Sequence, residues 1–298
     1  MRREAGAQTP DVSVIIPVFN SEQWLHECIN SALRQTGVGL QIICVNDGSE
    51  DQSAAILAEY ELLCPNIEVI TQANAGLSAA RNAGLAKITG RYVVFLDSDD
   101  YWREDDLAKL VACADRNELD LLVFDALPFP ALGVARETWQ RYRTYYRQRG
   151  TYEEPRTGVR LAADMQENKD YRPAAWKYLF AAELVQRHRL RFLPRVIHED
   201  NAFTFGLFLR AQRAAHMALP FYARRVRPES IMTTVSAQRS GASLERVWTQ
   251  MGRELVTVSH TVTPSELAQL RQIIQKVHDY AAKLFANAVA SAPDPIGM

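Results

Sequence analysis

The chain has 298 residues, of which 47% are hydrophobic and 23% charged, and its formal net charge at pH 7 is -1. This composition is typical of a soluble globular protein, and the length predicts a domain with an extension rather than one small core. The near balance of charges gives no global reason to expect a nucleic-acid partner.

The N-terminal residues include arginines but no apolar stretch, so residues 1–11 are predicted to form a flexible tail rather than a secretory signal. No segment approaches the roughly 20 apolar residues of a membrane span. The cysteines lie far apart and form no CxxC pair, which favours buried free thiols in a reducing compartment; they are Cys28, Cys44, Cys64 and Cys113. We therefore expect a cytoplasmic protein, and peripheral contact with the inner membrane face is compatible with that location.

Two β-branched runs enclose a helical pattern near the start of the chain. The first run is VSVIIPVF from Val12 to Phe19, and the second is QIICVNDGS from Gln41 to Ser49; both predict buried strands. Between them, apolar residues recur at helical spacing, with Ser21 as the expected N-cap and Gly37 as the end. This order predicts a βαβ unit.

The alternation of strands and helices continues. Helices are predicted over Asp51–Leu63, Leu77–Ile88 and Glu104–Arg116, and strands over Ile67–Thr71 and Tyr92–Leu96 and from Leu119 onward. Such repetition predicts an α/β fold with a mostly parallel sheet covered by helices on both faces. In these sheets, ligands bind beyond the carboxyl ends of the strands.

The periodic pattern is lost from Pro128 to about Arg172, where arginines alternate with aromatic residues. These side chains could stack on sugars or contact phosphates, or they could belong to an ordinary solvated helix whose aromatic residues turn inward. A strand-like MALPFYARRVR follows later. Beyond Gly241 the pattern predicts two amphipathic helices, which separate near Thr263–Glu266.

Carboxylates follow two of the predicted strands directly. Asp47 lies just past one, and Asp97 and Asp99 lie just past another, so both groups are expected to face one crevice. In an extended turn, Asp97 and Asp99 point the same way, which suits a shared cation, and all-oxygen ligands favour Mg²⁺ or Mn²⁺. A solvated turn is the alternative for such a short motif.

Three further positions each allow two interpretations. VNDGSEDQS fits a turn in which Asp51 caps a helix, or a loop in which Asp47 accepts hydrogen bonds from a base or ribose. Arg81 is either a solvent-facing helix residue or a phosphate contact at the edge of the crevice. In VIHEDNAF, Asp200 is either a helix N-cap or a general base.

The segments VSVIIPVFNSEQWLHECINSALRQT, VNDGSEDQS, NAGLSAARNAGL, GRYVVFLDSDD and HEDNAF, in this order and spacing, closely resemble the inverting family 2 glycosyltransferases of the GT-A fold. The resemblance extends from about Val12 to Thr234 and includes YARRVRPESIMT, a segment found in bacterial members that build surface polysaccharides. It implies a GT-A, Rossmann-like domain over residues 12–235. The nucleotide-binding half would span 12–126 and the acceptor and catalytic half 127–235, with a helical extension over 236–298.

The resemblance also implies roles for single residues. Asp200 would be the catalytic base, Asp47 would bind the uracil, and Asp99, together with Asp97, would contact the metal ion. The residues implied in nucleotide or donor binding are Pro17, Phe19, Asp47, Arg81, Asp97, Ser98, Arg224 and Arg227. Strand alternation would send Arg225 to the opposite face from Arg224. WKYLF departs from the Trp-Asn-Lys of many relatives, which leaves the acceptor-side contacts open.

The expected function is therefore metal-dependent, inverting sugar transfer with Mn²⁺ or Mg²⁺. The expected donor is a UDP-sugar, and the acceptor is a hydroxyl of a saccharide or lipid-linked glycan in polysaccharide, capsule or lipopolysaccharide synthesis. A non-catalytic nucleotide-sugar-binding protein of the same fold is the alternative. A dehydrogenase is disfavoured because it needs a Gly-x-Gly-x-x-Gly turn after the first strand, where this chain has PVFNSEQW.

Overall fold

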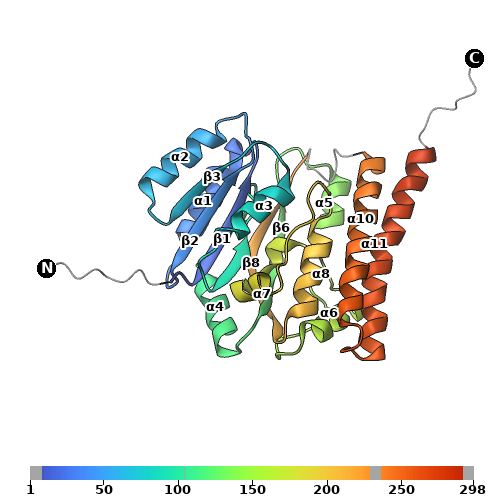
Figure 1. Ribbon diagram of the computed structural model, residues 1–298. Helices are drawn as coiled ribbons and strands as arrows, with labels where there is room; N and C mark the ends of the chain where they lie inside the picture. The colour runs from blue at the N-terminus through green and yellow to red at the C-terminus, as the bar shows by residue number, and fades with distance from the viewer. Residues whose placement is uncertain (1–8, 104, 229–235, 291–298) are drawn as a thin grey trace, which may run out of the picture.

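The computed structural model describes residues 9–103, 105–228 and 236–290. Eight strands form one sheet in the order β3-β2-β1-β4-β7-β6-β8-β5, and helices flank it (Figure 1). The strands are β1 (Val12–Val18), β2 (Leu40–Asn46), β3 (Ile67–Thr71), β4 (Tyr92–Phe95), β5 (Tyr101–Trp102), β6 (Leu121–Pro130), β7 (Tyr178–Ala181) and β8 (Ala214–Val226). The predicted α/β fold with a C-terminal helical segment is confirmed.

The direction of the strands changes along the sheet. The first four, β3-β2-β1-β4, are parallel, as the alternating pattern predicts. Next to them, β7 runs antiparallel to both of its neighbours, β4 and β6. Beyond β7, β6 and β8 are parallel, and the short β5 pairs antiparallel with β8. The carboxyl ends of β1, β2 and β4 therefore meet at one edge, where Asp47 and Asp97 lie.

The helices predicted up to Arg116 appear in the predicted order. The helices are α1 (Glu22–Leu33), α2 (Ser53–Leu63), α3 (Leu77–Leu85), α4 (Leu107–Arg116), α5 (Arg136–Tyr142), α6 (Gly158–Glu167), the 3-10 helix η1 (Ala175–Lys177), α7 (Ala182–Arg187), α8 (Asp200–Arg210), α10 (Ala237–Val258) and α11 (Pro264–Ala290). Of these, α5 and α6 lie in the region where the sequence showed no periodic pattern. The predicted start of α4 at Glu104 lies outside the described residues, as do residues 1–8 of the predicted tail. The prediction that α3 continues to Ile88 was wrong, since its helix ends at Leu85.

The starts of α1 and α2 are joined through one carboxylate. Asp51 accepts hydrogen bonds from the backbone N–H groups of Glu22 and Ser53, each at 2.9 Å. Asp51 thus ties the first residue of α2 to the start of α1, but the N-cap residue of α2 is Gln52, one position later than predicted, and its side chain makes no capping hydrogen bond. Ser21 is the N-cap residue of α1, as predicted, but its hydroxyl makes no capping hydrogen bond and instead contacts the hydroxyl of Ser98 at 2.7 Å.

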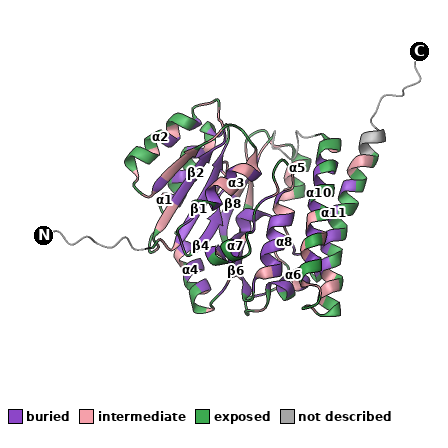
Figure 2. Cartoon of the chain, in the orientation of Figure 1, coloured by how far each residue is buried: buried purple, intermediate pink, exposed green. Residues whose placement is uncertain are grey.

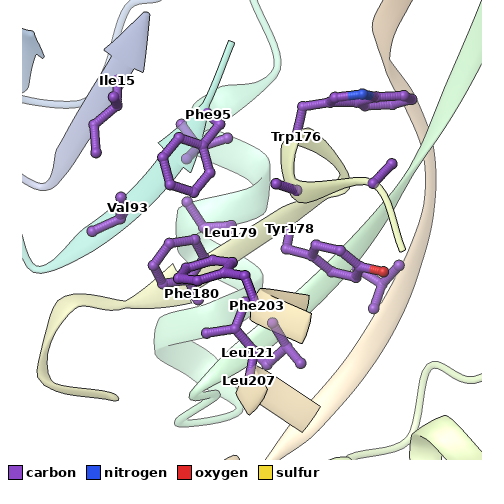
Figure 3. Packing of buried hydrophobic residues seen from close by; sticks show 14 of the residues in the cluster. Ile15, Val93, Phe95, Leu121, Trp176, Tyr178, Leu179, Phe180, Phe203 and Leu207 are labelled. Carbon is purple, nitrogen blue, oxygen red and sulfur yellow. The ribbon is translucent and has the colours of Figure 1, made fainter. Parts of the chain in front are cut away.

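Aromatic side chains from several elements pack together beneath the edge that carries the carboxylates (Figure 3). Phe95 of β4 lies 5.9 Å from both Phe180 of β7 and Phe203 of α8, measured between ring centroids. Phe192 stacks on Phe203 at 4.0 Å. The buried strands and the inner face of α8 appear in purple in Figure 2. Because this packing joins β4 to α8, it gives α8 a rigid support.

The region from 128 to 172 contains α5, α6 and buried aromatic residues. Tyr146 and Tyr152 turn into the core, but they lie beyond α5, which buries none of its own residues, and Tyr145 stays exposed. All four cysteines are free thiols; Cys28 and Cys44 are buried as predicted, and Cys64 and Cys113 are half-buried.

The two predicted C-terminal helices are confirmed as α10 and α11, which lie side by side next to α8 and α6 (Figure 1). Thr263 and Glu266 form a reciprocal cap at the start of α11: the N–H of Thr263 donates to Glu266 at 2.9 Å, and the N–H of Glu266 donates to the Thr263 hydroxyl at 3.3 Å. Within the described ranges, no helix has the length and apolar character needed to cross a membrane.

Candidate active site

Asp47 lies directly beyond β2 and organises the loop that leads into α3. One of its carboxylate oxygens accepts hydrogen bonds from the Gln72 side chain at 2.7 Å and the N–H of Ala75 at 2.9 Å, and the other accepts from the N–H of Gly76 at 2.8 Å. The next residue, Gly48, has φ +73, and a Cβ there would lie 2.8 Å from the backbone nitrogen of Asn74. Only glycine fits this turn without strain.

The residues predicted around the nucleotide lie close to this turn. Pro17 is buried in β1, and Phe19, just past β1, is exposed. The N–H of Asp47 donates to the carbonyl of Val18 at 2.8 Å, which brings the ends of β1 and β2 together. The contact between Ser98 and Ser21 also brings the turn after β4 close to the ends of β1 and β2.

Asp100 is the most buried member of the acidic turn that follows β4, with 1% of its surface exposed. Its carboxylate accepts hydrogen bonds from the Tyr222 hydroxyl at 2.9 Å, the N–H of Arg225 at 2.7 Å and the Arg224 guanidinium at 3.1 Å. Burial raises the pKa of Asp100 well above its usual value. Asp100 therefore fixes the turn on β8 and is not available to a ligand.

Asp99 projects beside Arg227, whose Nε donates to the carboxylate at 2.6 Å. Burial alone would raise the pKa of Asp99, but the charges of Arg224 and Arg227 outweigh it and hold the pKa below the usual value. The carbonyl of Asp99 accepts a 2.8 Å hydrogen bond from Arg225. The guanidinium of Arg225 also lies over the ring of Trp24, 4.0 Å from its centroid.

Arg81 connects the acidic turn with the start of α8. Its guanidinium contacts Asp97 at 2.9 Å, Glu199 at 2.8 Å and Asp200 at 2.6 Å. Arg81 is 1% exposed, so the solvent-facing interpretation was wrong. The apolar rings of Phe95 and Phe192 lie 5.7 and 5.2 Å from the guanidinium carbon. The phosphate contact that the family resemblance implies for Arg81 stays a prediction.

The carboxylates at the start of α8 have perturbed affinities for protons. Burial and the neighbouring charge of Asp200 raise the pKa of Glu199 to about 7. Burial also raises the pKa of Asp200, although Arg81 opposes that shift. The carboxylate of Asp200 lies against Arg81, and the N-cap residue of α8 is Glu199, whose side chain makes no capping hydrogen bond. A carboxylate held at the end of a rigid helix, with a raised pKa, has the properties that a general base needs.

Aromatic residues that the sequence did not point to hold the acidic turn in place. The hydroxyl of Tyr222 accepts a hydrogen bond from the N–H of Asp97 at 3.1 Å while it donates to Asp100. Trp176 stacks on Tyr222 at 4.3 Å, and Tyr146 packs against Trp176. The unusual WKYLF segment was the available signal, and its tryptophan supports the acidic turn through Tyr222.

The oxygens of Asp97 and Asp99 suit a divalent cation that also binds phosphate. In the part of the chain that the structure describes, no group of three or more histidine, cysteine, aspartate or glutamate side chains is arranged to hold a metal. Mg²⁺ and similar ions at phosphate sites are usually held by one or two carboxylates together with the substrate's phosphates. The donor set therefore fits such an ion when a diphosphate completes the coordination.

The sequence of residues 13–172 matches the family model described as "Glycosyl transferase family 2". The chain is 33% identical over 225 residues to the "Uncharacterized glycosyltransferase EpsJ" of Bacillus subtilis, a match that covers 74% of this chain and 63% of that protein. The chain thus spans less than two thirds of this relative's length.

Two solved structures resemble the fold. S. aureus TarS 1-349, solved in complex with UDP-GlcNAc, has a TM-score of 0.69 at 22% identity, and the match covers 92% of this chain and 73% of that one. The mannosyltransferase PcManGT from Pyrobaculum calidifontis, in complex with GDP-Man and Mn²⁺, has a TM-score of 0.59 at 17% identity, with coverage of 97% and 78%. At these identities the likeness is one of fold.

Proposed function

The chain belongs to glycosyl transferase family 2, and from this membership we propose that it transfers a sugar from a nucleotide-sugar donor to a hydroxyl group of a saccharide or lipid-linked glycan in surface-polysaccharide synthesis. One observation carries the proposal. Arg81 joins Asp97 of the acidic turn to Asp200 of α8, so the donor side and the base side meet at one buried guanidinium. The proposed reaction needs both sides at one anomeric carbon.

The donor would bind at the carboxyl ends of β1, β2 and β4. Pro17 and Phe19 would line the nucleotide pocket, with Ser98 beside them, and Asp47 would accept a hydrogen bond from the uracil. Both Asp47 oxygens already hold the loop from Gln72 to Gly76, and such a fixed carboxylate is well suited to orient a base. The UDP-GlcNAc complex of TarS supports a UDP-sugar as donor.

Asp99 and Asp97 would hold a Mn²⁺ or Mg²⁺ ion, as the Mn²⁺ complex of PcManGT supports. When bound, such an ion neutralises charge on the leaving diphosphate. Arg227 pairs with Asp99 in the structure, and Arg224 lies beside it on the end of β8. We propose that Arg227 exchanges Asp99 for the diphosphate when donor binds, because both partners are anions within reach of the same guanidinium.

Asp200 would act as the base in a single displacement. Its carboxylate takes the proton from the acceptor hydroxyl while the hydroxyl oxygen attacks the anomeric carbon. The bond between that carbon and the diphosphate oxygen breaks, and the electron pair leaves with the nucleoside diphosphate. Attack from the side opposite the leaving group inverts the configuration at the anomeric carbon. Arg81 would keep the Asp200 carboxylate turned toward the donor before the proton moves.

The first test is a thermal-shift titration of UDP, GDP, dTDP and CMP, each with and without Mn²⁺, because a ligand that binds only the folded state raises the melting temperature. We expect stabilisation by UDP that requires Mn²⁺. A higher melting temperature with another nucleotide instead would mean that the donor carries that nucleotide, and the proposed glycosyltransferase activity would stand. No shift with any of the four would count against the donor site.

The second test measures UDP release from UDP-GlcNAc, UDP-glucose and UDP-galactose, with simple glycosides as acceptors. Release of UDP that depends on the acceptor would support the proposed transferase activity. Binding of UDP without its release from any donor would favour the alternative, a non-catalytic nucleotide-sugar-binding protein of the same fold. Asp99 and Asp200 are both present in this chain, which favours the enzyme.

A further inference from the structure

The loop between α7 and α8 carries the candidate base at its end and has an unusual backbone. Arg189, Arg195 and His198 have φ values of +51, +56 and +65, in the left-handed region. Residues with a Cβ adopt this region only at a cost in free energy. Such conformations persist where surrounding contacts hold them in place, and they cluster at functional sites. The contacts of this loop therefore indicate what holds Asp200.

The C-terminal helices supply several of those contacts. The Nε2 atom of His198 lies 2.6 Å from the hydroxyl oxygen of Ser240 on α10. The rings of His198 and Tyr280 on α11 pack edge to face, with 6.0 Å between centroids. Arg246 of α10 donates to the carbonyl of Arg195 at 3.1 Å and to that of Pro194 at 3.2 Å. Side chains from both long helices thus contact the segment that leads into α8.

His198 also holds the first turn of α8 from the other side. Its carbonyl accepts hydrogen bonds from the backbone N–H of Asn201 at 3.2 Å and from the Asn201 side chain at 3.0 Å. Glu199 and Asp200 therefore lie between two fixed points: the His198 ring on α10 and Asn201 within α8. Because the turn is fixed at both ends, the backbone of Asp200 has little freedom to move. Its side chain is therefore restricted in orientation, and in the structure it points toward Arg81.

We propose that α10 and α11 position the base, and that the contact between His198 and Ser240 is the main attachment. The inference rests on the proposed function, in which Asp200 is the base. His198 and Ser240 are positioning residues, because they act through the backbone that carries Asp200. The helices next to α8 in Figure 1 would then belong to the catalytic machinery rather than only cover the core.

A second contact between the same helices provides a matched control. Arg210, at the last turn of α8, pairs with Glu254 of α10 at 2.6 Å. Because α8 spans Asp200–Arg210, an eleven-residue helix, this ion pair lies about 15 Å from the base. Glu254→Gln therefore weakens the attachment of α8 to α10 far from Asp200, whereas Ser240→Ala weakens it next to Asp200.

Ser240→Ala should lower kcat by about tenfold or more, since small displacements of a reacting group have effects of this size. The Kd for UDP with Mn²⁺ and the KM for the donor should stay within about twofold, because the donor site is untouched. Glu254→Gln should leave kcat within about twofold. A normal kcat in Ser240→Ala, or an equal loss in both variants, would overturn the proposal.

A double-mutant cycle tests whether His198 acts through Ser240. His198→Asn suits a left-handed φ but its side chain is too short to reach Ser240, so it separates the loss of the contact from the loss of the backbone conformation. The double variant with Ser240→Ala should be no slower than the slower single variant, because both remove one interaction. If the losses in kcat of the two single variants multiplied in the double variant, the two residues would act independently, which would contradict the proposed role of the contact between His198 and Ser240.

Hydrogen exchange separates this inference from the proposed function. Backbone amides of residues 199–204 should exchange faster in Ser240→Ala than in Glu254→Gln, if the contact orders the start of α8. Equal exchange in the two variants would overturn the positioning role whether or not the wild-type protein transfers sugar. A wild-type protein that releases no UDP from any tested donor would overturn the proposed function, and the exchange rates would still decide the attachment.

Discussion

Arg81 and Asp200 are 119 residues apart in the chain, and a 2.6 Å contact joins Nη1 of the arginine to Oδ1 of the aspartate. The same guanidinium also contacts Asp97 and Glu199, so one buried cation pairs with three carboxyl groups. In such a cluster, the loss of one partner leaves the others charged and unpaired. The contact therefore leads to predictions for both stability and catalysis.

Replacement of Arg81 should destabilise the fold and abolish transfer. Removal of one partner from a buried ion pair costs about 3–5 kcal/mol, so Arg81→Met should lower the free energy of unfolding by an amount of that order. Arg81→Lys should lose less stability but still lose most activity, because an ammonium group cannot replace the planar fork. Urea unfolding and UDP release measure the two effects.

The control for this prediction is Arg91→Lys. Arg91 also bridges two carboxylates, those of Asp11 and Asp115, but its side chain is 45% exposed. Exposed ion pairs contribute little to stability, so this variant should behave like the wild type. Similar losses in Arg81→Lys and Arg91→Lys would contradict a special role for the buried guanidinium.

The two carboxylates at the start of α8 should respond differently to conversion into amides. Asp200→Asn should retain UDP binding and lose transfer by about 100-fold or more, the usual size of base catalysis. Burial and the charge of Asp200 raise the pKa of Glu199 to about 7, so an uncharged side chain is tolerated there near neutral pH, and Glu199→Gln should keep transfer within about tenfold. Steady-state kinetics on both variants test the assignment, which a normal rate in Asp200→Asn would refute.

Arg227 and a divalent cation should compete for Asp99. Arg227→Gln removes the cation that contacts Asp99 in the structure, so Mn²⁺ alone should bind more tightly to this variant. UDP should bind more weakly in the presence of Mn²⁺, because a positive charge for the diphosphate is lost. Isothermal titration calorimetry measures both affinities.

Asp99→Asn should weaken the binding of Mn²⁺ and the binding of UDP in the presence of Mn²⁺. Unchanged Mn²⁺ dependence of UDP binding in that variant would argue against Asp99 as a ligand.

Lys177 should make the stability of the protein depend on pH above neutrality. Its side chain is buried, and among the described residues its ammonium nitrogen has no hydrogen-bond partner. Burial lowers its pKa from 10.5 to about 8. Between pH 8 and 10.5 the unfolded chain therefore binds more protons than the folded one, so the free energy of unfolding should rise with pH across this window.

Lys177→Met removes the free-energy cost of burying a charged ammonium group. At pH 7 the variant should be more stable than the wild type by an amount of the order of 3 kcal/mol, and the difference should shrink as the pH approaches 10.5. Lys283→Met, at an exposed lysine of α11, serves as the control and should leave the pH dependence as it is. Urea unfolding at pH 7 and at pH 10 gives the comparison, and a constant difference between Lys177→Met and the wild type would contradict the prediction.

The sequence predicts the parts of this protein that depend on local pattern. The β-branched runs beginning at Val12 and Gln41 form β1 and β2, and the carboxylates after the strands lie at one edge because parallel strands end together. The partners of Arg81 could not be predicted in this way. Residues 199 and 200 reach it through the packing of α8 on the sheet, which depends on contacts between distant segments such as Phe95 and Phe203.

The supports of the acidic turn are hard to predict for a similar reason. Asp100 is one of three neighbouring acidic residues in sequence, and only the position of β8 makes it the one that Tyr222 and Arg225 bury. The direction of β7 also escapes local pattern, because an isolated run such as YLFA has the same composition in a parallel and an antiparallel strand.

The position of β7 determines where fragments of this protein can be cut for expression. β7 lies in the middle of the sheet, between β4 and β6, and yet it follows residue 172, where the match to the family model stops. A fragment cut at that boundary would leave the edges of β4 and β6 without a partner and uncover the aromatic cluster, so it should aggregate. The segment that the family model matches is thus shorter than the segment that folds, and expression fragments should extend at least through β8.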